Sequence, residues 1–179
     1  MITKATALLA AVAMGVAVSA AQAADPAHED AQLNNAKVSL NEAIGIAEQQ
    51  GSGQAISADY KAAKKGSTMG AYDVKVLSTD GKNLTEYRIS SSSGKVKKAS
   101  EEPFEKMFTR IKPSDLQNAP TSLKTAIKTA EAQSGGKVVD ADTDRAGDTV
   151  RYTVKVAKAD GTTEKIKVNG ADGKVASAK

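Results

Sequence analysis

The feature that most constrains this fold is an internal repeat. The segment SLNEAIGIAEQQGSG begins at Ser39 and the segment SLKTAIKTAEAQSGG begins at Ser122, so the two align at an offset of 83 residues. Further along, YDVKV matches YTVKV at an offset of 80, and GKV matches GKV at an offset of 79. Because the offset changes only between patterned segments, the chain contains two copies of one structural unit. We call residues 37–98 the first copy and residues 121–179 the second copy.

Each copy begins with a predicted helix. Ser39 and Ser122 are residues of a type that caps helix N-termini, and apolar residues follow each at helical spacing. Glycines at positions 51 and 53, and at 135 and 136, predict where the helices end. The residues expected to face the core are Leu40, Ala43, Ile44 and Ala47 in the first copy, and Leu123, Ala126, Ile127 and Ala130 in the second.

Segments that alternate between apolar and polar residues follow each helix and predict strands, with Asp-Gly pairs at the hairpins. The two hairpin loops differ in length by one residue, which keeps Tyr87 and Ile166 on the same face of their strands. The predicted fold class is α+β: two tandem domains, each with one helix packed on a three- to four-stranded antiparallel sheet. The other face of each sheet is expected to be solvated.

The order of these motifs resembles the PepSY domain. The shared pattern is Ser-Leu-x-x-Ala-Ile-x-x-Ala, a glycine stop, Tyr-x-Val-x-Val, Asp-Gly and then x-Gly-Lys-Val, and it covers residues 38–98 and 121–176. PepSY domains often have an acidic residue after the third strand, where this chain has Ser90 and Asn169. The resemblance implies a non-enzymatic, peptidase-inhibitory or envelope-associated module.

The N-terminus has the pattern of a secretory signal peptide over residues 1–23. Lys4 is followed by an uncharged apolar run and by an A-x-A cleavage site that ends at Ala23. We therefore expect a periplasmic or secreted protein, cleaved after Ala23, with no transmembrane segment left after signal removal. Residues 24–36 read as an acidic flexible tail, in which His28 lies among carboxylates that offer at most a weak metal site.

The segment between the copies, residues 99–120, predicts a short amphipathic helix followed by a linker. Phe104, Met107, Phe108 and Ile111 recur at helical spacing between Pro103 and Pro113. One interpretation is a helix that caps the first copy or joins the two copies. The other is a docking surface for a partner protein.

The composition argues against several kinds of catalysis. The chain has no cysteine and one histidine, which excludes a disulfide framework, a thiol nucleophile and a multi-histidine zinc site. The aspartates of residues 140–148 fail the calcium-loop template, because arginines stand at positions 145 and 151. We expect no catalytic residues, no cofactor and no metal.

Candidate binding residues come from the expected solvated face and from the linker. They are Lys155, Lys165 and Lys167 of the second copy, Leu77 and Leu84 near the first hairpin, and Phe104 and Phe108 of the linker. The sequence favours an exported module that binds or inhibits a peptidase or another envelope protein. The alternative is an anion- or metal-binding protein that uses the basic face or the acidic tail, with an anionic polymer or a lipid surface as partner. No nucleic-acid motif appears, so nucleic acid is not an expected partner.

Overall fold

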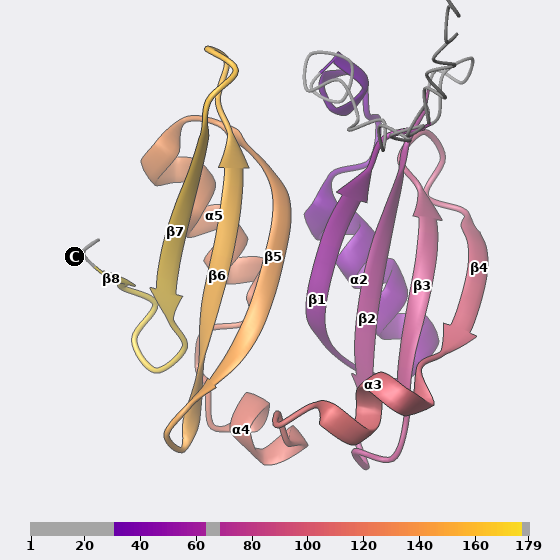
Figure 1. Ribbon diagram of the computed structural model, residues 1–179, viewed down its shortest axis with the longest axis vertical. Coiled ribbons are helices and arrows are strands. Elements are labelled where there is room, and N and C mark those ends of the chain that lie inside the picture. The colour runs from indigo at the N-terminus through magenta and orange to yellow at the C-terminus, as the bar shows by residue number, and fades with distance from the viewer. Residues whose placement is uncertain (1–30, 64–68, 177–179) are drawn as a thin grey trace, which may run out of the picture.

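The computed structural model describes residues 31–63 and 69–176, which form a mixed structure of helices and antiparallel strands (Figure 1). The signal peptide, His28 and most of the acidic tail lie outside these ranges. The elements in the first half of the chain are α2 (Leu40–Gly51), β1 (Gly53–Lys61), β2 (Ala71–Ser78), β3 (Leu84–Ser90) and β4 (Val96–Glu101). Two short helices follow, α3 (Pro103–Phe108) and α4 (Pro113–Gln117). The second half contains α5 (Leu123–Ser134), β5 (Lys137–Ala146), β6 (Thr149–Ala157), β7 (Thr163–Asn169) and β8 (Val175–Ala176).

The eight strands of the described residues form one antiparallel sheet in the order β4-β3-β2-β1-β5-β6-β7-β8. The α+β class is therefore confirmed, but the expected pair of separate sheets is replaced by a single sheet. The junction is the pairing of β1 with β5, in which Ser57, Ala58 and Asp59 stand opposite Asp142, Ala141 and Asp140. Helices α2 and α5 lie side by side on the same face of this sheet (Figure 1).

The two helices begin in the same way. The Ser39 hydroxyl accepts a hydrogen bond from the Glu42 backbone N–H at 3.2 Å, and the Ser122 hydroxyl accepts one from the Thr125 backbone N–H at 3.2 Å. In the first copy the Glu42 carboxylate also accepts from the Ser39 backbone N–H, which completes a capping box. The sequence prediction of both N-caps is therefore confirmed.

A buried tyrosine in each copy fixes the chain just before the helix. The Tyr72 hydroxyl donates to the Val38 carbonyl at 2.6 Å, and the Tyr152 hydroxyl donates to the Thr121 carbonyl at 2.6 Å. Val38 and Thr121 occupy equivalent positions in the repeat, and so do the two tyrosines. The repeated Tyr-x-Val-x-Val motif thus orients the helix as well as filling the core.

The first strand of each copy contains a β-bulge that the sequence did not predict. The register shifts between Ala55 and Ser57 in β1, and between Val138 and Asp140 in β5. A glutamate of the overlying helix accepts a hydrogen bond from the backbone N–H beside each bulge. Glu48 accepts from Ala55 at 3.1 Å, and its counterpart Glu131 accepts from Val138 at 3.3 Å. Because a bulge disrupts ladder pairing, this glutamate compensates for a lost backbone partner.

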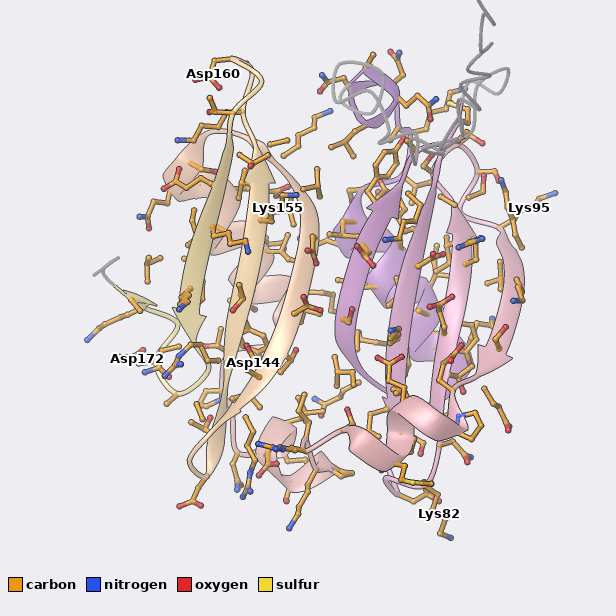
Figure 2. The ribbon with its side chains drawn as sticks, viewed as in Figure 1. Lys82, Lys95, Asp144, Lys155, Asp160 and Asp172 are labelled. Atoms are coloured by element: carbon orange, nitrogen blue, oxygen red, sulfur yellow. The ribbon has the colours of Figure 1, made fainter. Side chains whose placement is uncertain are left out.

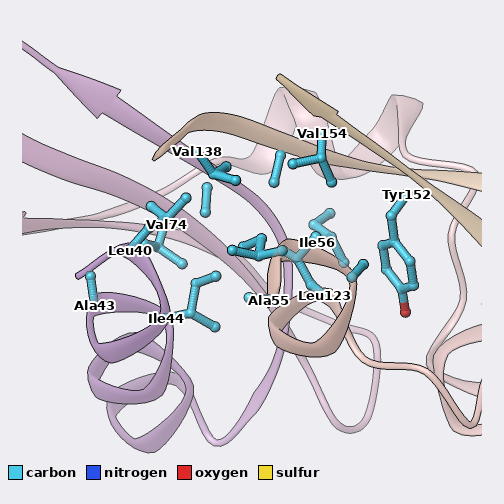
Figure 3. Close-up of a cluster of buried hydrophobic side chains, with 14 of the residues drawn as sticks. Leu40, Ala43, Ile44, Ala55, Ile56, Val74, Leu123, Val138, Tyr152 and Val154 are labelled. Carbon is cyan, nitrogen blue, oxygen red and sulfur yellow. The ribbon is translucent and has the colours of Figure 1, made fainter. Parts of the chain in front are cut away.

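The core lies between the two helices and the sheet, and buried side chains from both copies belong to one cluster (Figure 3). The largest fully buried residues are Tyr72, Tyr152, Ile44, Leu77, Leu84, Ile89, Ile127 and several valines. Lys124 of α5 also forms an ion pair with Glu48 of α2 at 2.7 Å. The two copies therefore share one core and do not stand as separate bodies on a linker.

Three details differ from the sequence-based expectations. Residues 31–34 form a helical turn with Leu33 buried, so the described part of the acidic tail packs against the core. In α2 the left-handed C-cap residue is Ser52, at φ 47°, and not one of the flanking glycines. Strand β4 continues to Glu101, beyond the expected end of the first copy at residue 98. Within the described ranges, no helix has the length and apolar character needed to cross a bilayer.

Candidate functional site

The sheet face opposite α2 and α5, which we call the outer face, carries the charged side chains of alternate strand positions. Figure 2 shows Asp144 and Lys155 on this face, turned away from the helices. Strand register places its residues in rows that run across both copies. One row reads Lys98, Arg88, Asp73, Asp59, Asp140, Lys155 and Lys165, from β4 to β7. The row is basic at both ends of the sheet and acidic in the middle.

In the first copy the charges of the outer face neutralise one another. Arg88 and Asp73 are register partners, and the Arg88 guanidinium Nε donates to Asp73 Oδ1 at 2.7 Å. Lys75 stands opposite Glu86 and also donates to both carboxylate oxygens of Glu105, each at 2.7 Å. Because Glu105 belongs to α3, this bond holds the short helix over the outer face of β2 and β3 (Figure 1).

The α3–α4 segment also covers an apolar pair on this face. Leu77 and Leu84 stand opposite each other in β2 and β3, and each is only 2% exposed. They belong to the same buried cluster as Ile111 and Leu116 from the segment between the copies. The prediction that Leu77 and Leu84 are binding residues is therefore wrong in this structure, because they are already covered by the chain itself.

The linker residues Phe104 and Phe108 lie in α3, but their side chains fall outside what the structure describes. Met107 of the same helix is 73% exposed. Helix α4 is fixed to the second copy by an ion pair between Arg145 Nε and the buried Asp115 carboxylate at 3.3 Å. The segment between the copies thus joins them, which agrees with the first of the two interpretations of the sequence.

Strands β6 and β7 of the second copy carry a basic part of the outer face that no other element covers among the described residues. Lys155 stands directly opposite Lys165, and Lys167 stands opposite Thr153. Lys165 and Lys167 are exposed, Lys155 is partly exposed, and none of the three forms an ion pair within 4.0 Å among the described residues. The structure therefore places the three predicted lysines together on adjacent strands.

The middle of the outer face carries carboxylates from both copies. Asp59 stands between Asp73 and Asp140, and Asp142 lies two residues further along β5. Partial burial, followed by the charges of Asp142 and Asp59, raises the pKa of Asp140. Partial burial also raises the pKa of Asp142, with further contributions from Asp59 and Asp144. The described residues contain no group of three or more acidic or histidine side chains with metal-binding geometry.

The β5–β6 turn sets the partners of the outer-face aspartates. Ala146 pairs with Thr149, so Gly147 and Asp148 are the two residues of the turn. This register places Asp144 opposite Arg151 and Asp142 opposite Thr153.

One hollow in the described part of the chain lies at the end of the molecule near the α5–β5 corner. It encloses about 410 Å³ and is lined by Leu33, Asn34, Gly136, Lys137, Ala157 and Lys158. Lys158 is neutralised by Glu164 at 2.6 Å, and Lys137 donates to the Asn34 carbonyl at 3.5 Å. The hollow offers no pairing of nucleophile and base, so it has no evident catalytic chemistry.

Comparison with known proteins gives a family match for one of the two copies. The search of curated proteins gives no match. Among solved structures, the crystal structure of a "putative lipoprotein (CD1622)" from Clostridium difficile 630 is 18% identical, with a TM-score of 0.47. The alignment covers 83% of this chain and 97% of that one. A likeness at this level carries no conclusion about this chain. The PepSY family model, described as "Peptidase propeptide and YPEB domain", matches residues 121–179, which are the second copy.

Proposed function

We propose that this protein is a non-catalytic, exported PepSY-type module that binds or inhibits a peptidase or another protein of the cell envelope. The observation that carries the proposal is the match of residues 121–179 to a family described as a peptidase propeptide domain. A propeptide acts by binding a peptidase. Binding needs a stable surface on the propeptide and does not need catalytic residues in the propeptide.

We extend the PepSY assignment to the first copy on structural grounds. Both copies consist of one N-capped helix followed by four antiparallel strands. Both also contain the tyrosine bond to the segment before the helix and the glutamate that satisfies the bulge. Agreement in such particular contacts supports two tandem PepSY domains, residues 37–98 and 121–179, joined by residues 99–120.

Inhibition assays test the peptidase role. The mature chain, residues 24–179, would be titrated into a thermolysin-type metallopeptidase and into peptidases purified from the envelope of the source organism. We expect concentration-dependent inhibition, or a stable complex by size-exclusion chromatography, with at least one of them. A lack of both with every peptidase tested would contradict the proposal.

Export is a separate part of the proposal and has its own test. The signal pattern at residues 1–23 supports cleavage after Ala23. Mass spectrometry of the protein recovered from the extracytoplasmic fraction should give an N-terminus at Ala24. Recovery of an intact chain from the cytoplasm alone would contradict export.

A further inference from the structure

We propose that the open outer face of the second copy binds an acidic polypeptide segment of the partner, through Lys155, Lys165 and Lys167. This inference deepens the proposed function by giving the chemistry of the partner and the surface that it contacts. It starts from a position-by-position comparison of the two copies.

Strand register makes the two outer faces directly comparable. Lys75 and Lys155 are equivalent, as are Arg88 and Lys167, so both copies keep these basic positions. The acidic positions are not kept. Thr153 stands where the first copy has Asp73.

The second lost acidic position is beside Lys155. Lys165 stands where the first copy has Glu86. The second copy therefore retains the two cations and lacks both of these carboxylates. It has one carboxylate that the first copy lacks, because Asp140 stands opposite Lys155 on β5 where the first copy has Ser57 opposite Lys75.

The stability of the fold does not account for the presence of Lys165 beside Lys155. Like charges directly opposite each other on adjacent strands are destabilising, and Lys155 stands directly opposite Lys165. The first copy shows that the same fold accommodates the complementary pair Lys75–Glu86 at these two positions. Asp140, on the other side of Lys155, offsets part of this repulsion. Lys165 and Lys167 of β7 have no acidic register partner, and this pattern points to a ligand that supplies negative charge there.

In the first copy, a segment of the chain itself occupies the position that such a ligand would take. There a short peptide segment, α3, lies on the outer face and places the Glu105 carboxylate 2.7 Å from Lys75. The equivalent Lys155 forms no ion pair within 4.0 Å among the described residues, although Asp140 stands opposite it on β5. We infer that a segment of the partner presents a carboxylate to Lys155, as Glu105 does to Lys75.

The chemistry of the surrounding surface fits recognition by charge and not by apolar burial. The apolar pair Leu77 and Leu84 of the first copy is replaced by Ala157 and Thr163 in the second. The surface therefore carries short polar side chains beside the three lysines, which lie on adjacent strands. An acidic peptide, either extended or forming one helix, matches such a surface better than a small molecule, because a small molecule needs an enclosing pocket.

The central experiment gives the outer face of the second copy the carboxylates of the first copy. The variant Thr153→Asp with Lys165→Glu restores the two missing carboxylates at positions where the fold already accepts them. The probe is a fluorescein-labelled peptide of ten residues rich in glutamate, and a glutamine version of the same peptide is its control. Anisotropy titrations of the mature chain give the Kd at low and at raised salt.

We expect the glutamate peptide to bind, the glutamine peptide not to bind, and raised salt to weaken the complex. Thr153→Asp with Lys165→Glu should weaken binding at least tenfold while the circular dichroism spectrum stays unchanged. The matched control, Lys97→Glu with Lys128→Gln, has the same change in net charge at exposed positions away from this surface. It should bind like the wild type.

Several results would overturn the inference. These are no binding of the glutamate peptide, equal weakening by the control variant, or binding only to vesicles containing phosphatidylglycerol, which would indicate a lipid surface instead. Peptidase inhibition measured on the same variants separates the two proposals. If inhibition persists unchanged in Thr153→Asp with Lys165→Glu, the protein is still a peptidase-binding module, but the lysine surface is not its docking site.

Discussion

Ala58 of β1 stands directly opposite Ala141 of β5, and the two alanines occupy the same position in the two copies of the repeat. Ser57 and Asp59 face Asp142 and Asp140 on either side of this pair. The junction therefore has the geometry of an isologous contact, in which the same strand of each copy pairs with its equivalent around a two-fold axis. The two copies within this chain are therefore arranged like the two identical subunits of a symmetric dimer.

A first prediction concerns this alanine pair. Both side chains are 0% exposed beneath the helices, so there is no room for a larger residue. Ala141→Leu should lower the free energy of unfolding by about 1–3 kcal/mol through overpacking. Urea denaturation followed by circular dichroism would measure the change. Ala132→Leu, at an exposed position of α5, is the control and should have little effect. Equal stability of Ala141→Leu and the wild type would show that the junction is looser than the structure indicates.

A second prediction follows from the shared core. Ile127 of α5 is fully buried in the cluster that contains residues of both copies. Ile127→Ala should cost about 2–5 kcal/mol. Because one sheet and one cluster span both copies, the loss should shift a single unfolding transition of the whole chain. Calorimetry that resolves two transitions, with only the second copy destabilised, would instead indicate that the copies unfold independently.

The sequence predicted the local structure well because its signals are local. Ser39, Ser122 and the apolar positions at helical spacing determine where the helices begin and which face they bury. The one-residue difference between hairpin loops correctly keeps Tyr87 and Ile166 on the buried face. Each of these features depends on neighbours a few residues apart, which a single sequence displays directly.

What the sequence did not reveal depends on contacts between distant segments. The pairing of Ala58 with Ala141 has no sequence signal, because any edge strand offers the same backbone groups. The burial of Leu77 and Leu84 depends on the path of residues 99–120 over the outer face. The bulge at Val139 was hidden because Val139 itself continues the alternation of Ala141 and Thr143 and so has the pattern of an ordinary inward-facing position.

A third prediction concerns the carboxylates that face each other across the junction. Asp59 stands opposite Asp140, and burial together with neighbouring negative charge raises the pKa of Asp140. A carboxyl group with a raised pKa in the folded state favours folding most at low pH, and this contribution is lost as the pH rises through that pKa. Asp140→Asn should therefore raise the free energy of unfolding at pH 7, by about 0.2–1 kcal/mol. The gain should disappear near pH 3.

Denaturation midpoints at both pH values would test this prediction. Asp148→Asn, in the exposed β5–β6 turn, is the control. A variant Asp140→Asn that is less stable than the wild type at pH 7 would mean that the attraction to Lys155 outweighs the repulsion from Asp59.

A fourth prediction concerns alkaline pH. Burial raises the pKa of Tyr152 to about 12, and its hydroxyl donates to the Thr121 carbonyl. An unfolded tyrosine ionises near pH 10, so the stability that Tyr152 contributes is complete below about pH 10 and is lost as the pH rises through 12. Absorbance at 295 nm should show that Tyr152 ionises as the protein unfolds.

The variant Tyr152→Phe should lack this ionisation step. It should also lower the free energy of unfolding at pH 7 by about 1–3 kcal/mol, because the buried Thr121 carbonyl loses its hydrogen-bond partner. Ionisation of Tyr152 near pH 10 in the folded protein would contradict its burial.

A fifth prediction uses the difference between the C-cap residues of the two helices. Ser52 and Gly135 are equivalent positions, and both adopt the left-handed conformation, at φ 47° and φ 70°. A residue with a Cβ is strained there, whereas glycine is not. The Ser52 side chain is exposed and makes no hydrogen bond to the described residues, so its removal loses no contact.

Ser52→Gly should therefore raise the free energy of unfolding by about 0.5–1 kcal/mol, and Gly135→Ser should lower it by a similar amount. Nothing lies within 4 Å of a Cβ added at Gly135, so backbone strain alone is responsible for the second effect. Chemical denaturation of the two single variants and of the double variant measures both. Because the sites lie in different copies, the two effects should add to nearly zero in the double variant. A Ser52→Gly variant less stable than the wild type would show that α2 does not end in the left-handed cap.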